Sequence, residues 1–190
     1  MTFVRPIRAE DWPQYQALHE EAARLHPEAF ATTYEDELGV TLEQWSELPA
    51  AKAQDRVRRC AESRDEVILV ADNDCQLVGM VGLTRRQAPG NARPSGEQFA
   101  QTARVWGMYV QADFRGQQLG HALIHEVIRW AKHMQGVTKL QLEVNAINTP
   151  AIRLYRSHAF KETGRLNRES AATSLTGGQP RDIILMELLL

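Results

Sequence analysis

The stretch from residue 105 to residue 134 constrains the fold most strongly, because it joins an apolar run to an amphipathic helix through a polar turn. Val105 to Val110 is apolar enough to predict a buried strand. Gly116 and Gly120 lie in the turn, and an apolar stripe at helical spacing follows: Leu119, Leu123, Val127, Trp130 and Met134. The first N–H groups of a helix lack internal partners, and the helix dipole adds partial positive charge there. We therefore expect this turn to hold a phosphate-containing cofactor.

The flanking sequence alternates strand and helix patterns, which predicts an α/β fold. Hairpin strands coexist with strand–helix–strand units, so we expect a mixed, largely antiparallel central sheet of about six to seven strands with helices on both faces. No linker separates domains, so residues 1–190 are expected to form a single domain. The expected strands are Phe3–Arg8, Val67–Ala71, Gln76–Leu83, Leu140–Val144 and Arg181–Leu190. The expected helices run from Glu10–Pro13 to His26, from the capping box Thr41–Gln44, from Ala50 to about Ser63, and from Pro150 to His158.

Composition excludes several classes of function. The 190 residues contain 24 Asp and Glu against 22 Lys and Arg, a formal net charge of −2, which gives no electrostatic case for nucleic acid or an anionic membrane surface. The two cysteines, Cys60 and Cys75, are too few for a disulfide framework and match no metal-ligand spacing. The N-terminus lacks a signal-peptide apolar region, and no apolar run approaches the roughly 20 residues that cross a bilayer. We expect a soluble, cytoplasmic protein without a metal site.

Two motifs in a fixed order make the family recognisable. The first motif falls between Arg115 and Ala122. It consists of an Arg or Gln, any two residues, a Gly, any one residue, and then a Gly or Ala. The second motif falls between Asn148 and Phe160. It reads Asn-x-x-Ala-x-x-Leu-Tyr and is followed by a pair that resembles Gly-Phe. With both motifs the chain resembles the GNAT superfamily of acetyl-CoA-dependent N-acyltransferases. The resemblance covers a cofactor-binding core of about residues 67–160, and the N-terminal third follows only by the order of its elements.

The first motif fits in two registers. If it begins at Arg115, Gln118 stands where the commonest form has its first glycine, and only Gly120 is kept. If it begins at Gln117, then Gly120 and Ala122 complete the pattern. The first register is tolerable if Gln118 adopts an ordinary helical conformation. In the second motif, an alanine precedes Phe160 where the family usually has glycine, so the backbone there is less free.

The resemblance implies acetyl-CoA as cofactor and assigns it a set of residues. Backbone amides of the turn would face the pyrophosphate, and a nearby arginine would add charge. The end of the central strand would part from its neighbour and pair with the pantetheine arm, and a backbone N–H near Met108 would stabilise the oxyanion. Asn148 would cap the following helix, hydrogen-bond the cofactor, or do both. The implied cofactor-binding residues are Met108, Tyr109, Val110, Arg115, Gly116, Gln117, Gln118, Gly120, His121 and Asn148.

The implied reaction moves an acetyl group to a primary amine by direct attack through a tetrahedral intermediate. Tyr155 is the expected catalytic acid for the leaving thiolate, with its hydroxyl facing the cofactor while Leu154 and Phe160 belong to the core. The general base is open among solvent and several side chains: Glu37, Glu97, His121, Glu143 and His158.

The acceptor would be a small-molecule or peptide amine, and the acidic, aromatic stretch Phe30–Glu37 would suit a cationic one. The main alternative is a non-catalytic acyl-CoA-binding sensor or interaction module of the same fold. A dinucleotide-binding enzyme is disfavoured because the turn lacks a third spaced glycine. The sequence leaves homodimer formation open.

Overall fold

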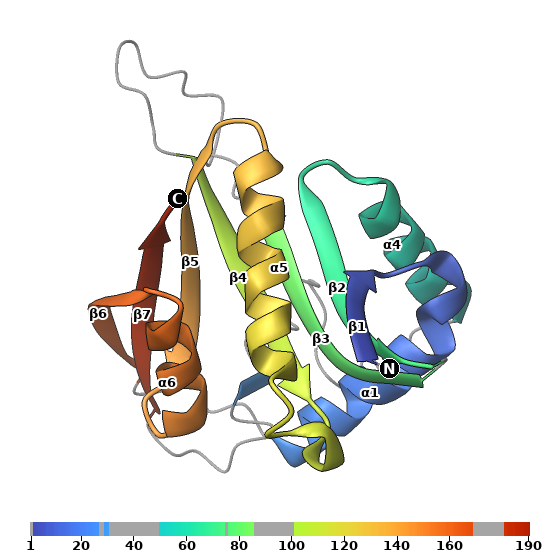
Figure 1. Cartoon of the computed structure of the whole chain (residues 1–190), viewed down its shortest axis with the longest axis horizontal. Coiled ribbons are helices and arrows are strands. Elements are labelled where there is room, and N and C mark those ends of the chain that lie inside the picture. Colours follow the sequence, from blue (N-terminus) through green and yellow to red (C-terminus); the bar gives the residue numbers. More distant parts are fainter. Residues whose placement is uncertain (1, 27–28, 31–49, 75, 86–100, 169–180) are drawn as a thin grey trace.

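Seven strands form one mixed sheet at the centre of this computed structural model, in the order β1-β2-β3-β4-β5-β7-β6 (Figure 1). Strands β4 and β5 pair in parallel, and the other five neighbouring pairs are antiparallel. The structure describes residues 2–26, 29–30, 50–74, 76–85, 101–168 and 181–190. The strands are β1 (Thr2–Pro6), β2 (Glu66–Asn73), β3 (Gln76–Arg85), β4 (Gln101–Val110), β5 (Val137–Asn145), β6 (Lys161–Arg168) and β7 (Arg181–Leu189).

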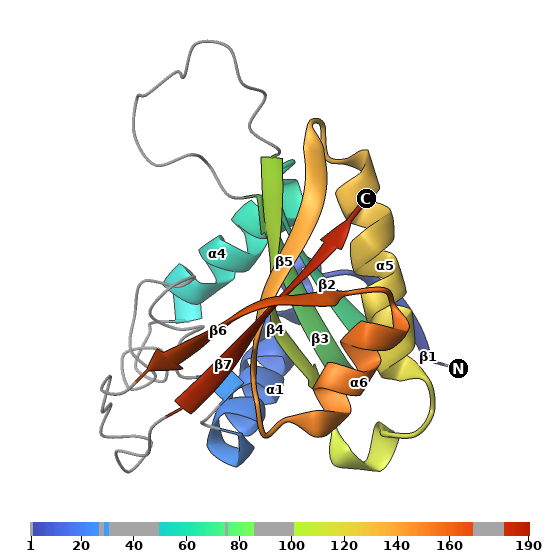
Figure 2. The same ribbon diagram turned by 90° about the vertical axis from the view of Figure 1, so that its left-hand side faces the viewer.

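Helices cover both faces of the sheet, as the sequence predicted. Figure 2 shows α1 (Trp12–Leu25) and α4 (Ala50–Glu62) on one side, and α5 (Leu119–His133) and α6 (Thr149–Ser157) on the other. None of these described helices is both long and apolar enough to cross a bilayer.

Each face of the sheet buries its own apolar cluster. The α5 and α6 side contains Leu69, Leu123 and Leu140, each 0% exposed, and the α1 and α4 side contains Ile68, Val70 and Trp106. Successive residues of β2 point to opposite faces, so a strand covered on both sides must be apolar throughout. This explains the continuous apolar run Val67–Ala71 in the sequence.

Strands β4 and β5 separate partway along their length. Their last paired residues are Arg104 and Gln141, although β4 continues to Val110 and β5 to Asn145. On its other edge β4 has a register shift against β3, and Gly107 there adopts a left-handed φ of 61°, which is typical of a β-bulge. The parting that the family resemblance implied is therefore confirmed, and it leaves a gap beside the end of β4.

Most predicted elements are confirmed with shifts of a few residues at their ends. The hairpin closes where Asn73 pairs with Gln76, and the central strand is longer than expected because it begins at Gln101. Strand β6 was not assigned from the sequence, since its polar, mostly exposed residues carry little apolar alternation. The predicted helix at Thr41–Gln44, most of the acidic stretch that begins at Phe30 and the Gly-, Ser- and Thr-rich segment before β7 lie outside the described residues.

Candidate functional site

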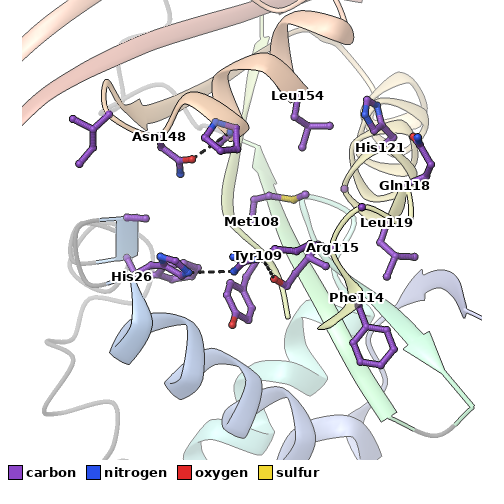
Figure 3. Close-up of a pocket in the computed structure, with 18 residues that line it drawn as sticks. His26, Met108, Tyr109, Phe114, Arg115, Gln118, Leu119, His121, Asn148 and Leu154 are labelled. Atoms are coloured by element: carbon purple, nitrogen blue, oxygen red, sulfur yellow. Dashed lines mark hydrogen bonds between the residues drawn. The ribbon is translucent and has the colours of Figure 1, made fainter. Parts of the chain in front are cut away.

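A pocket of about 620 Å³ opens where β4 and β5 part. Its walls come from the end of α1, the end of β4, the turn into α5 and the start of α6 (Figure 3). All ten residues assigned to the cofactor by resemblance line this pocket except Gln117. The side-chain amide of Gln117 instead donates to the carbonyl of Asp113, 3.1 Å away, and so ties the turn to itself.

The backbone of the turn departs from the conformation that the sequence analysis required of Gln118. Gln118 is the N-cap of α5 and has φ 64° and ψ 6°, which is left-handed rather than ordinary helix. Gly116, two residues earlier, also has a positive φ, of 77°. A glycine at position 118 would adopt this conformation without strain. The geometry therefore favours the motif register that begins at Arg115, with Gln118 at the position of the first glycine.

Arg115 crosses the pocket and contacts the opposite wall. Its Nε donates to the carbonyl oxygen of Val110 at 2.9 Å, and its Nη2 lies 3.2 Å from Nε2 of His26, the residue that follows α1 (Figure 3). The guanidinium also lies over the ring of Tyr109, 5.7 Å from the ring centroid. The charge is thus held beside the end of β4, in a contact with α1 that no sequence motif reveals.

The charge of the pocket suits an anion. Of the described residues that line it, Arg115 is the only one with a permanent charge, and none is acidic. Gly120 lies in the first turn of α5, where N–H groups lack helical partners, and it also faces the pocket. An added Cβ at Gly120 would lie 3.2 Å from Cδ2 of Leu154, so glycine keeps α5 and α6 close together there.

Asn148 has one of its two expected roles in this structure. Its Oδ1 accepts a hydrogen bond from the backbone N–H of Ala151 at 3.2 Å, which caps α6. The same side chain lines the pocket, so its amide group lies beside any molecule bound there (Figure 3).

The structure differs from the expected orientation of α6 at Tyr155. Leu154 packs against the core, as expected, but it also lines the pocket together with Ala151, whereas Tyr155 does not appear among the described lining residues. Tyr155 is 6% exposed and packs in the core with its ring centroid 5.8 Å from that of Phe160. Ala151 and Leu154 therefore face the pocket, while Ile152 and Tyr155 form the buried side of α6. Burial raises the pKa of the Tyr155 hydroxyl.

The candidate bases occupy different places. Glu143 lies on β5, two residues beyond the last residue that pairs with β4, on the α1 side of the sheet. Its Oε1 is 3.8 Å from Nη2 of Arg104, and both residues line a second cavity of about 240 Å³. His121 and His158 lie against each other, with Nδ1 and Nε2 3.1 Å apart. Glu37 and Glu97 lie outside the described residues.

Nine of the described lining residues were not assigned to the cofactor from the sequence: His26, Ala29, Phe30, Phe114, Leu119, Ile147, Pro150, Ala151 and Leu154. Ile147, which precedes the N-cap of α6, is 78% exposed. Phe30 begins the aromatic, acidic stretch that was expected beside the acceptor amine. His26 carried no signal, because it follows α1, far in sequence from both motifs.

The comparisons with known proteins agree with this geometry. The family model described as the acetyltransferase (GNAT) family matches residues 10–160, and the chain belongs to this family. A rat protein, N-acetyltransferase 8B, is 32% identical over 96 residues, which is 50% of this chain and 40% of the rat protein. The chain therefore matches less than half the length of that relative.

Solved structures share the fold at low sequence identity. An acetyltransferase of the GNAT family from Streptococcus pneumoniae has a TM-score of 0.71 and 20% identity, with 100% of both chains covered. The yncA protein of Salmonella typhimurium, solved with its cofactor acetyl-CoA, has a TM-score of 0.71 and 19% identity, covering 100% of this chain and 94% of that one. These likenesses establish an α/β GNAT fold.

Proposed function

We propose that this protein is an N-acetyltransferase that moves an acetyl group from acetyl-CoA to a primary amine. The observation that carries this proposal is the 620 Å³ pocket at the parting of β4 and β5, which joins a helix N-terminus and Arg115 to an apolar passage. The yncA structure with acetyl-CoA supports the choice of cofactor, because it has the same fold.

The cofactor would lie along the pocket with its phosphates at the turn. Backbone N–H groups at the start of α5 would bind the pyrophosphate, and Arg115, held beside the pocket by Val110 and His26, would add its charge. The pantetheine arm would follow the end of β4, where Met108 and Val110 lack a paired strand on the β5 side.

Bound acetyl-CoA would supply a thioester whose carbonyl carbon is open to attack by an amine. The backbone N–H of Met108 would donate to the carbonyl oxygen as negative charge develops. Tyr155 would give its proton to the departing sulfur; because burial raises the pKa of this hydroxyl, it remains protonated at neutral pH. This role requires the cofactor sulfur to reach the inner side of α6, deeper than the pocket wall formed by Leu154.

Glu143 is the base that the geometry favours. It is a half-buried carboxylate near the point where the strands part, on the sheet face opposite α5 and α6, so an amine approaching from that face would meet it. The other described candidates contact each other: His121 lies in the first turn of α5, on the side of the pocket assigned to the phosphates, and His158 follows α6.

A non-catalytic acyl-CoA-binding module is the second candidate, and the absence of Tyr155 from the described pocket wall favours it. Two measurements separate the candidates. Both expect acetyl-CoA to raise the Tm of the protein, and no shift at saturating cofactor would contradict both. Release of free CoA in a screen of small amines and peptides is expected only of the enzyme, and binding without turnover on any amine favours the module.

A further inference from the structure

One carboxylate of α1 holds the end of β4 through both of its oxygens. The hydroxyl of Tyr109 donates to Oε1 of Glu21 at 2.6 Å, and Nε2 of Gln111 donates to Oε2 at 2.8 Å. The two donors flank Val110 in sequence. Glu21 is half-buried on α1 and belongs to neither sequence motif.

The residues held in this way belong to the pocket. Tyr109 and Val110 line it, and the carbonyl of Val110 accepts the hydrogen bond from Nε of Arg115. A displacement of Tyr109 and Gln111 would therefore move the carbonyl that positions Arg115. It would also move the end of β4 where the strand has lost its parallel neighbour.

The two hydrogen bonds to Glu21 are strong enough to hold the end of β4 in place. Hydrogen bonds to a charged group are shorter and stronger than neutral ones. Burial, and next the hydrogen bond to Glu21, raise the pKa of Tyr109 to about 12, so its hydroxyl remains a donor at neutral pH. The ring of Tyr109 is 4% exposed and contacts Phe30 edge-on, which limits its other positions.

We infer that Glu21 is a positioning residue for cofactor binding, acting through Tyr109 and Gln111 on the end of β4 and on Arg115. This inference rests on the proposed function. Glu21 does not line the described pocket, so it would act on the cofactor only through other residues. A purely structural role would instead be limited to holding α1 against the sheet, and would leave cofactor affinity unchanged in folded variants.

The test is calorimetric titration of the full chain with acetyl-CoA, comparing Glu21→Ala with Glu20→Ala. Glu20 is the matched control, since it is the adjacent carboxylate on α1 and its contact, 3.0 Å from Nε2 of Gln16, stays within the helix. We expect Glu21→Ala to raise the Kd about tenfold, and Glu20→Ala to stay within about twofold of wild type. Glu21→Gln retains an acceptor and is expected to fall between the two.

Two further variants keep the inference testable if Glu21→Ala does not fold. Tyr109→Phe and Gln111→Ala each remove one donor, and each is expected to weaken binding about threefold. In the Glu21→Ala background, Tyr109→Phe should add little, because its partner is already gone. An unchanged Kd in Glu21→Ala, or in both donor variants, would overturn the inference while wild-type binding stands; no binding by wild type would overturn the proposed function as well.

Discussion

Nδ1 of the His121 imidazole lies 3.1 Å from Nε2 of His158, and this contact joins the first turn of α5 to the end of α6. The two rings are tilted by 40°, with their centroids 5.1 Å apart. At this distance the pair can share one proton but not hold two without repulsion. The contact therefore stabilises the packing of the start of α5 against the end of α6 only while at least one imidazole is neutral.

Stability should consequently fall in mild acid. Burial, then the nearby His121 and His125, lower the pKa of His158 from its usual 6.5. The unfolded chain then takes up a proton at a higher pH than the folded chain, so stability is full above pH 6.5 and is lost as the pH falls toward the lowered pKa. We expect the Tm of wild type to drop more between about pH 7.5 and about pH 5.5 than that of His158→Gln. Equal losses in the two proteins would contradict this explanation.

A glycine at position 159, just after α6, should stabilise the protein. Ala159 follows the helix with a φ of 65°, and the N–H of Phe160 bonds back to the carbonyl of Tyr155 at 3.1 Å. A left-handed residue with a Cβ costs about 1–2 kcal/mol, and glycine loses part of that gain by making the unfolded chain more flexible. Ala159→Gly should therefore raise the free energy of unfolding by about 0.5–1 kcal/mol in a denaturant titration. Ala131→Gly, within α5, is the control that should destabilise.

Gln118→Gly tests the register of the phosphate-binding turn. Because Gln118 has a φ of 64°, glycine should relieve strain there and raise the Tm without weakening acetyl-CoA binding. Gln117 has no positive φ, so Gln117→Gly should lower the Tm. The reverse order of stability would favour the register that begins at Gln117.

Tyr155→Phe separates catalysis from binding. If the hydroxyl protonates the leaving sulfur, kcat should fall at least about tenfold while the Kd for acetyl-CoA stays within about threefold. Tyr15→Phe, a buried tyrosine on α1 outside the pocket, is the control for loss of a hydroxyl. Wild-type turnover by Tyr155→Phe would exclude the role of acid.

The fold was largely predictable because its signals are local. The apolar run at Val67–Ala71, the turn at residues 72–75 and the stripe along α5 each follow from spacing alone. Strand β6 escaped prediction because an edge strand with one exposed face needs few apolar residues. Its pairing with β7 is a tertiary contact that sequence spacing does not record.

The site was predictable where one sequence motif indicated both a turn or helix and its role in binding the cofactor. The turn from Arg115 to Gly120 is such a case, and most of its residues line the pocket. The contact of Arg115 with His26 joins residues far apart in sequence, so no local pattern could reveal it. The direction of Tyr155 was misjudged because both Leu154 and Tyr155 are apolar enough for a core, so their sequence does not say which one faces the pocket.

Acetyl-CoA binding to a blocked pocket tests the central claim most directly. Ala151 faces the pocket from α6, so Ala151→Trp would fill the space assigned to the cofactor, whereas Arg153→Trp places the same ring on the exposed side of that helix. In calorimetric titrations we expect one acetyl-CoA to bind per wild-type chain and per Arg153→Trp chain, with affinity at least about tenfold weaker for Ala151→Trp. Equal affinity in Ala151→Trp and wild type, or no binding by wild type, would contradict the account.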